Sequence, residues 1–380
     1  MKNRREFLQA GCLGALALNL GAMTAFPDSS ELPIISARLG EPTPYEDSFG
    51  DVWSTTWADD DDLYSVSDDT RGFKNACDSN LAINRISGEM PPDLEGTTIN
   101  PMSEYGPMVG ISPLDGGNWK GGGITCVGGV LYLAVCRNDG AYVRDPRGPD
   151  YWIQEAWDAS IIKSVDHGKS WSPAPKIGHA MFPGRNFCYP CFVEYGKNGA
   201  GHKDEFVYAV SPDGSWNNAS SMTMGRVPRD RIGRLDPGDW EFFHGFAQDM
   251  KPIWWPRQDT ARTILRSPGR TSMASIYYVA PLDVYILPQW SRDYTRPEVQ
   301  DPALRKKVTR FEFYQAPAPW GPWTLFHEQT IAPQGFYCPV IPSKFVSKDG
   351  RKLWLFTAGN PPDKRWYRLT MIPVTLEVRI

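Results

Sequence analysis

The chain has 380 residues and a formal net charge of −4, so it lacks the basic excess that nucleic-acid binding requires. Hydrophobic residues make up 41% of the sequence and aromatic residues 13%, which is enough for a sizeable core. The 35 glycines and 34 prolines are scattered between strand-like runs, and this pattern indicates many tight turns rather than disorder.

The N-terminus carries the pattern of an export signal. Arg4 and Arg5 precede an acidic and two apolar residues, and a short apolar run follows over residues 10–22. Together they predict a twin-arginine signal peptide over residues 1–25, cleaved near Ala25, and export to the periplasm or beyond by the twin-arginine machinery. The run is shorter than the roughly 20 residues that span a bilayer. No later segment is apolar enough either, so we expect no stable membrane anchor.

The cysteines do not form a clear functional motif. Cys188 and Cys191 have the spacing of a redox or zinc half-site, but no second pair of this kind exists. Cys126 and Cys136 flank a Gly-Gly turn, and a bridge between neighbouring strands is an alternative for them. We expect buried free thiols, no cofactor and no catalytic metal, because the five histidines show no paired spacing.

A strand, a tight turn and a second strand recur five times beyond the leader. The copies occupy residues 51–58 and 63–67, 123–127 and 130–136, 190–195 and 205–211, 271–278 and 284–287, and 340–346 and 353–357. Further strands are expected near 160–164, 222–227 and 308–314. Four-stranded antiparallel units arranged radially are propeller blades.

The sequence therefore predicts an all-β, five-bladed β-propeller over residues 50–380. The segment 26–49 is an N-terminal extension. Within it, residues 32–38 are expected to meet a final strand near 373–378 and close the ring.

A turn motif supports the propeller independently. Residues 164–171 match the Asp-box of sialidase-like propellers at every fixed position. Asp166 accepts hydrogen bonds from turn N–H groups, Gly168 permits a positive φ, and Trp171 packs between strands. A degenerate copy lies at Trp320 to Trp323. The motif is structural and does not indicate catalysis.

Several stretches resemble a five-bladed propeller family of exported bacterial proteins, formerly of unknown function, whose members are linked to endo-D-arabinanase activity. The stretches are residues 50–60, 213–218, 226–232, 319–323 and 354–359. At one remove the chain is similar to the arabinanase and sialidase propellers. The resemblance implies glycoside hydrolysis by paired carboxylates, but it does not fix the sugar.

Propeller geometry predicts which side chains meet. The starts of the innermost strands and the ends of the second strands face one end of the channel, whereas the turn between them faces the other. Asp51, Asp68 and Asp69 should therefore converge at the mouth, and the acidic run 59–62 should lie in a solvated turn at the far end. The same sorting predicts substrate contacts from Asp68, Tyr105, Trp119, Arg137, Asp213, Trp216, Arg270, Trp290 and Arg292.

Glycoside cleavage needs one carboxyl group that gives a proton and a second that attacks or activates water. We expect Asp51 as nucleophile or base and Asp69 as the acid or its partner, with Glu104 and Asp139 in reserve. The predicted function is hydrolysis of an arabinan-like or related polysaccharide by a monomeric enzyme. The alternatives are a non-catalytic glycan-binding propeller, a sialidase with three clustered arginines and Tyr337 as nucleophile, and a polysaccharide lyase.

Overall fold

The computed structural model describes residues 31–113, 115–144, 152–175, 178–293, 308–331, 336–360 and 365–379. Within these ranges the chain forms strands, turns and short 3₁₀ segments, and no α-helix. None of the helical segments in the described ranges has the length and apolar character needed to cross a membrane. The predicted signal peptide lies outside the described residues.

The strands form four hydrogen-bonded sheets, and the ten-stranded sheet consists of two groups joined by the parallel pair β10–β16. With this sheet divided at that pair, the strands are described below as five sheet units, numbered in chain order. The first unit contains β3 (Ser48–Trp57), β4 (Leu63–Phe73), β5 (Ser79–Met90) and β6 (Asp93–Asn100). The second contains β7 (Asn118–Val127), β8 (Val130–Arg144) and β9 (Trp152–Ser164). The third contains β10 (Cys191–Glu194), β11 (Phe206–Pro212), β12 (Ala219–Pro228), β13 (Glu241–Phe246), β14 (Pro252–Trp255) and β15 (Thr263–Thr271).

The fourth unit contains β16 (Ile276–Val279), β17 (Val284–Arg292), β18 (Thr309–Ala316) and β19 (Thr324–Ile331). The fifth contains β20 (Tyr337–Val340), β21 (Lys352–Asn360) and β22 (Arg365–Val378), together with β1 (Ile34–Leu39) and β2 (Thr43–Pro44). The 3₁₀ segments are η2 (Ser103–Tyr105), η3 (Lys197–Gly199), η4 (Ile232–Arg234), η5 (Pro237–Asp239), η6 (Gln258–Thr260), η7 (Ala280–Leu282) and η8 (Ser343–Phe345).

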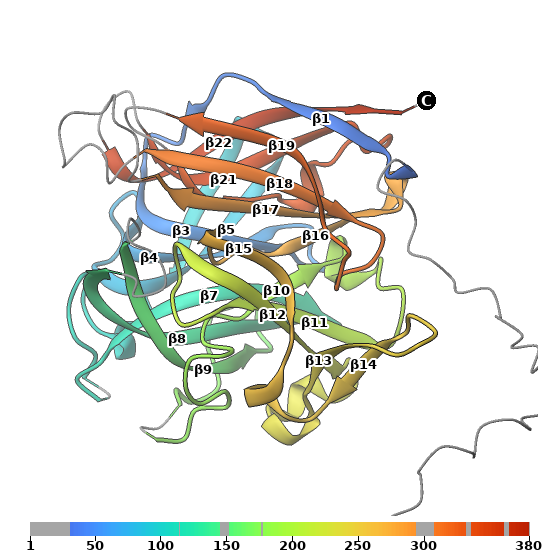
Figure 1. Cartoon of the computed structure of the whole chain (residues 1–380). Coiled ribbons are helices and arrows are strands. Elements are labelled where there is room, and N and C mark those ends of the chain that lie inside the picture. Colours follow the sequence, from blue (N-terminus) through green and yellow to red (C-terminus); the bar gives the residue numbers. More distant parts are fainter. Residues whose placement is uncertain are drawn as a thin grey trace, which may run out of the picture.

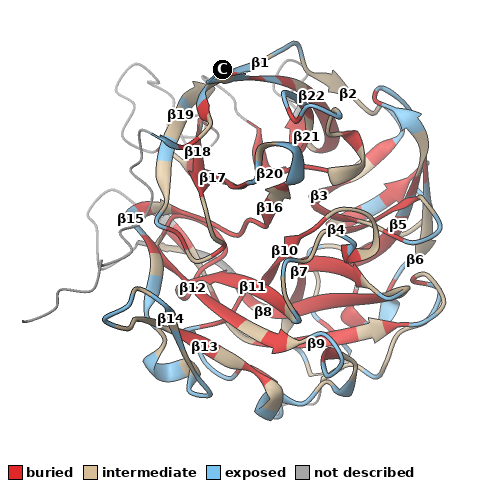
Figure 2. Cartoon of the chain, turned by 90° about the vertical axis from the view of Figure 1, so that its right-hand side faces the viewer, coloured by how far each residue is buried: buried red, intermediate tan, exposed pale blue. Residues whose placement is uncertain are grey.

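The first strands of the five units lie innermost around a common centre (Figure 2). β3 contacts β7, β7 contacts β10, β10 pairs with β16 in parallel, and β20 contacts β3. Each predicted strand–turn–strand copy is a hydrogen-bonded pair: β3–β4, β7–β8, β10–β11, β16–β17 and β20–β21. The all-β prediction is therefore confirmed.

The units differ in detail from the predicted four-stranded blades. The second unit has three strands among the described residues, and the third adds the β13–β14 hairpin and β15. In the fourth copy the inner strand begins at Ile276 rather than Thr271, because the backbone N–H of Ser272 donates to the Gln289 side chain instead of a ladder. In the fifth copy the inner strand ends at Val340, since Pro342 has no N–H to donate.

The two ends of the described chain pair within one sheet. β1 lies antiparallel to β22, with Ile34 opposite Val378 and Leu39 opposite Val374 (Figure 1). The side-chain amide of Gln315, in the fourth unit, forms hydrogen bonds with the backbone of β1. It accepts from the N–H of Ile34 at 3.0 Å and donates to the C=O of Ile34 at 2.6 Å. The N-terminal strand is thus held by two neighbouring units.

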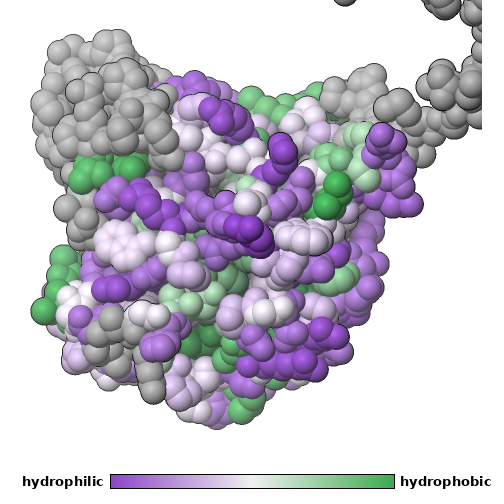
Figure 3. Space-filling view, turned by 60° about the horizontal axis from the view of Figure 1, so that its bottom comes forward, coloured by the Kyte–Doolittle hydropathy of each residue, from purple (hydrophilic) through white to green (hydrophobic). Residues whose placement is uncertain are grey.

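Apolar side chains fill the space between the units. One large cluster of buried residues spans all five units, and a smaller one lies between the first and second. The six cysteines of the described residues form no disulfide, and five of them are buried. On the face shown in Figure 3, hydrophilic residues predominate and hydrophobic residues form small separate groups.

Replacing Gln315 by alanine tests how the N-terminal strand is fastened. The Gln315→Ala change leaves a buried backbone N–H and C=O without partners, and we expect a loss of about 2 kcal/mol or more in the free energy of unfolding. Urea unfolding followed by tryptophan fluorescence measures it. Gln248→Ala, at an exposed position, serves as the control. Equal stability of the two variants would contradict the proposed role.

Candidate functional site

The candidate site begins where β3 and β4 are irregular. Asp51 lies opposite Asp68, and the ladder shifts on both sides of this pair. Val52 and Trp53 have φ values of 72° and 59°, and Asp69 has 40°. Left-handed backbone is uncommon outside glycine, and such residues cluster at functional sites. These bulges turn side chains of neighbouring residues in the first unit towards one cavity.

A cavity of about 200 Å³ lies at this end of the inner strands. Four of the predicted site residues line it: Asp51, Asp68, Asp69 and Trp216. The other lining residues are Val52, Val109, Asn118, Lys120, Asn138, Gln154, Tyr189 and Tyr367. Asp51, Asn118 and Lys120 lie near the start of inner strands and Asp68 and Asp69 lie in a second strand, whereas Gln154 and Tyr367 belong to the third strands β9 and β22.

Lys120, at the start of β7, pairs directly with Asp69. Its ammonium forms an ion pair with Asp69 Oδ1 and donates to Asn80 Oδ1 at 3.2 Å. The Lys120 side chain is 9% exposed and that of Asp69 is 14% exposed, so this ion pair is largely shielded from water. The pair joins β4 of the first unit to β7 of the second.

Asp51 is a cavity carboxyl group whose proton affinity is raised. Burial raises the pKa of Asp51 from 3.8 to about 7, and the negative charge of Asp69 adds to the rise. Arg292, a hydrogen bond from Tyr337 and Lys120 act in the opposite direction. Near neutral pH, Asp51 therefore exists in both protonation states, which suits an acid that gives up a proton.

Asp68 lies deeper than the other two acids. It is 2% exposed, and its Oδ1 accepts from the N–H of Gly121 at 2.8 Å while its Oδ2 is buried without a hydrogen-bond partner. Burial raises the pKa of Asp68 well above its ordinary value, against the opposing effect of Lys120. Burial therefore favours the protonated form of Asp68, and its contact with Gly121 joins the first and second units.

Aromatic rings and one guanidinium group lie next to Trp216, which lines the cavity. The ring centroids of Trp216 and Trp290 lie 5.2 Å apart, and that of Tyr337 lies 5.7 Å from Trp290. The Arg292 guanidinium lies 5.9 Å from the Trp216 ring and 5.4 Å from the Tyr337 ring. Trp216 faces the cavity, whereas Trp290 is fully buried behind it.

The remaining predicted charged residues are engaged elsewhere. Arg137 lies 3.5 Å from Asp115, and Arg270 lies 2.9 Å from Glu312. Asp213, which follows β11, accepts from the backbone N–H groups of Ser220 and Ser221 at the start of β12. None of these three side chains lines the cavity. Their positions match structural ion pairs and a turn cap.

The other predicted residues also lie outside the cavity. Tyr105 and Trp119 belong to the buried cluster between the first and second units, and Glu104 is exposed in η2. Trp290 belongs to the large buried cluster. The side chain of Asp139 lies outside the described residues.

Several cavity residues were not identified from the sequence as contacts. Lys120 stands in a strand-like run in which a lysine would ordinarily face solvent, and Tyr189 precedes a proline in a loop. Gln154 is an isolated amide without a motif, and so is Asn80, which contacts Lys120 but does not line the cavity. Only its position could have identified Lys120 as a site residue, because it lies near the start of an inner strand, as Asp51 does.

The acidic run 59–62 lies at the other end of β3, as expected, but it is less solvated than predicted. Asp61 accepts from Trp57 and pairs with Lys197 at 2.9 Å and Lys344 at 3.3 Å, and these lysines belong to the third and fifth units. Asp62 is buried and pairs with Arg85. The turn therefore joins neighbouring units.

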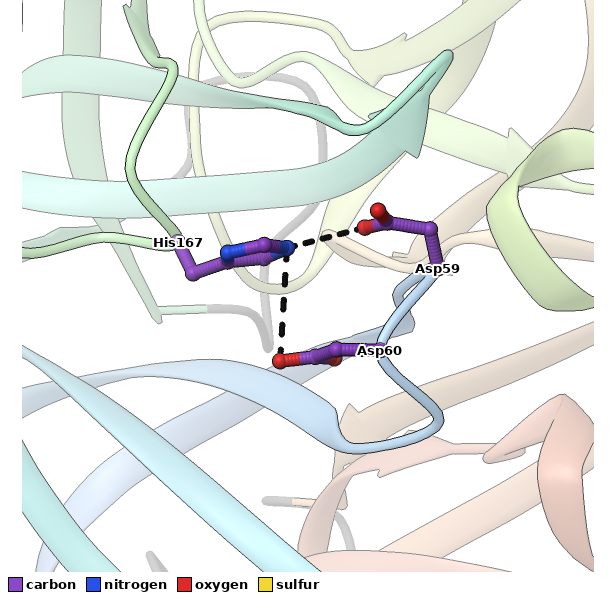
Figure 4. Close-up of side chains that lie close together, drawn as sticks. All are labelled: Asp59, Asp60 and His167. Atoms are coloured by element: carbon purple, nitrogen blue, oxygen red, sulfur yellow. Dashed lines mark hydrogen bonds and ion pairs between the residues drawn. The ribbon is translucent and has the colours of Figure 1, made fainter.

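Asp59, Asp60 and His167 point toward one another at this far end (Figure 4). His167 Nε2 lies 2.9 Å from Asp59 Oδ1 and 4.0 Å from Asp60 Oδ2. In the described part of the chain these are the three metal-ligating side chains whose ligand atoms gather within 4.8 Å. The hydrogen bond to His167 lowers the pKa of Asp59. An ion pair between the first and second units explains this arrangement.

The predicted Asp-box residues form a closed turn after β9. Asp166 accepts from the Ser170 N–H at 2.9 Å and from the Ser170 hydroxyl at 2.6 Å. Gly168 has φ 82°, and the Trp171 indole donates to the Gly168 carbonyl at 3.1 Å. The turn lies far along the sheet from the cavity and serves structure.

Comparison with solved structures finds GH43 enzymes. A GH43 β-xylosidase/α-arabinofuranosidase from a compost microbial metagenome, in complex with xylotriose, is 12% identical over 90% of this chain and 98% of its own, with a TM-score of 0.48. A GH43_1 enzyme from Xanthomonas citri, complexed with xylotriose, is 11% identical over 89% and 92%, with a TM-score of 0.45. The Bacteroides ovatus xyloglucan PUL GH43B protein is 16% identical over 88% of this chain, which spans 54% of that protein, with a TM-score of 0.47. No protein-family model and no curated protein matches the sequence.

The raised pKa of Asp51 predicts how stability depends on pH. Because the folded chain holds this proton more tightly than the unfolded chain, the contribution of Asp51 to stability declines as pH rises from about 4 to about 7. Relative to Asp51→Asn, the wild type should lose about 2–3 kcal/mol between pH 5 and pH 8. Urea unfolding of both proteins at the two pH values measures it, and a difference that does not change with pH would contradict the assignment.

Proposed function

We propose that this protein is a five-bladed β-propeller glycoside hydrolase that cleaves an arabinan-like or related polysaccharide with a pair of carboxyl groups. The observation that carries the proposal is the cavity in which Asp51 and Asp69 meet beside Lys120. The five sheet units with their first strands around one centre support the blade number (Figure 2).

The sequence led us to expect Asp51 as nucleophile or base and Asp69 as the acid. The burial and charges around these two residues favour the opposite assignment. Asp51 keeps its proton up to about pH 7 and so serves as the general acid that protonates the leaving oxygen. Asp69 forms an ion pair with Lys120 and serves as the nucleophile or as the base that activates water. Crowded carboxyls in different surroundings divide these roles between them.

The shape of the cavity fits one small sugar ring. Its volume of about 200 Å³ lies below the roughly 300–1,000 Å³ of pockets that enclose larger ligands. Trp216 offers an aromatic face, and Val109, which is 70% exposed, lies at the rim. Asn118, Asn138 and Gln154 supply hydrogen-bonding amides. The neighbouring sugar residues of a longer polysaccharide would lie outside the cavity, over its rim.

The arginine positions disfavour a sialidase. Arg137 and Arg270 pair with acids of the protein, and Arg292 is the member of the predicted set that stands beside cavity residues. The hydroxyl of Tyr337 bonds to Asp51 rather than to a glutamate. A carboxylate-binding triad of arginines is therefore not assembled in the described residues.

We further propose that the enzyme acts outside the cytoplasm as a monomer. The paired arginines at positions 4 and 5 and the short apolar run after them support export by the twin-arginine machinery. N-terminal sequencing of the secreted protein would test the expected cleavage near Ala25. Light scattering would test the oligomeric state.

Substitution of the two carboxyls tests the proposed chemistry. We expect Asp51→Asn and Asp69→Asn each to lower kcat on the substrate by about 10²–10⁴-fold, because each removes one of the two proton-transfer or bond-forming groups. The measurement is release of oligosaccharides from a panel of arabinans, arabinogalactans and xylans.

Asp249→Asn, which changes an exposed acid paired with Lys251, is the matched control and should keep wild-type activity. Thermal melting establishes that each variant is folded. Normal hydrolysis by folded Asp51→Asn and Asp69→Asn would show that the pair is not catalytic. Binding of a polysaccharide without cleavage by the wild type would favour a glycan-binding propeller.

A further inference from the structure

Lys120 and the residue that follows it contact two acids of the neighbouring first unit. Its ammonium contacts Asp69, while the next residue, Gly121, donates its N–H to Asp68. Both acids belong to β4 of the first unit, and Lys120 and Gly121 belong to β7 of the second. Two adjacent residues of one strand therefore fix two adjacent residues of another.

β7 and β4 lie so close together at Gly121 that the backbone there has little room to move. A Cβ atom added to Gly121 would lie 2.5 Å from Val66 Cγ2 and 3.0 Å from Asp68 Oδ1. Glycine at this position thus lets β7 lie against β4. Asn80 anchors the lysine from behind, since its Oδ1 accepts from Nζ while its amide N–H groups donate to the carbonyls of Tyr105 and Gly110.

A buried ammonium group is costly unless it is paired, so its presence here calls for a function or a compensating contact. Lys120 is 8% exposed and lines the cavity together with all three acids. Without its charge, the cavity would gather three carboxyls with Arg292 as the remaining nearby cation on Asp51. The lysine charge therefore opposes the effect of burial on Asp51 and Asp68.

We propose that Lys120 is a positioning residue that holds Asp69 as a carboxylate against the cavity wall and leaves Asp51 as the carboxyl group that exchanges a proton. This inference deepens the proposed function and depends on it for its catalytic meaning. The electrostatic part concerns the resting protein and stands apart from any substrate.

The groups that face Asp51 come from five elements or their flanks. They are Asp68 and Asp69 of β4, Lys120 of β7, Tyr189 before β10, Arg292 of β17, and Tyr337 and Cys338 of β20. Lys120 and Arg292 are the cations among them. Removing the lysine charge should make Asp51 hold its proton to higher pH, because a nearby positive charge favours the ionised form.

The test compares Lys120→Met and Lys120→Gln, which remove the charge, with Lys120→Arg, which keeps it. In protein labelled with ¹³C at aspartate carboxyls, the resonance absent from Asp51→Asn identifies Asp51. We expect its titration midpoint to rise by about one pH unit in the two neutral variants and to stay near the wild-type value in Lys120→Arg. Two neutral variants guard against one that does not fold.

Activity supplies the second readout. The alkaline limb of kcat/KM, which reflects loss of the proton from the acid, should move upward by the same amount in the neutral variants. An unchanged Asp51 midpoint in all variants would overturn the proposal. So would a rise in KM with an unchanged pH profile, because that result would make Lys120 a substrate contact. If no polysaccharide is hydrolysed, the proposed function fails while the titration still decides the role of Lys120.

Discussion

The ion pair between Lys120 and Asp69 is the interaction on which the account of the site depends. Three carboxyls share a cavity of about 200 Å³, and they cannot all be ionised there at a tolerable cost. One ammonium from the next sheet unit pairs with one carboxylate, and burial raises the pKa of the other two carboxyls. The proposed acid and base are thus distinguished by their surroundings rather than by their residue type.

The rest of the fold serves to hold these groups in place. Bulges at Val52 and Trp53 interrupt β3 where Asp51 must face the cavity. At the opposite end, Asp61 joins the first unit to Lys197 and Lys344 of two other units. Contacts at both ends fix how β3 sits against its neighbours. Small changes in the angle between units would move Lys120 and Asp69 relative to each other.

The sequence predicted the strands well and the site in part. Alternation and turn residues located the inner strands of the first three copies, but those of the fourth and fifth copies lie several residues from the predicted positions. Strand direction alone placed Asp51 and Asp69 at one end. Side-chain partners could not be predicted this way, because Arg137 and Arg270 find acids that are distant in sequence, Asp115 and Glu312. Lys120 was missed since a single lysine in a strand carries no motif. The roles of Asp51 and Asp69 depend on burial, which the sequence does not report.

The central claim is that one sugar ring sits between Asp51 and Asp69. A crystal structure of the Asp51→Asn variant with a bound oligosaccharide from a cleaved polysaccharide tests it most directly. The account predicts a glycosidic oxygen within about 3.2 Å of the residue 51 amide, and an anomeric carbon or its attacking water within about 3.5 Å of Asp69. An oligosaccharide bound at the opposite end, near Asp59 and His167, would contradict it.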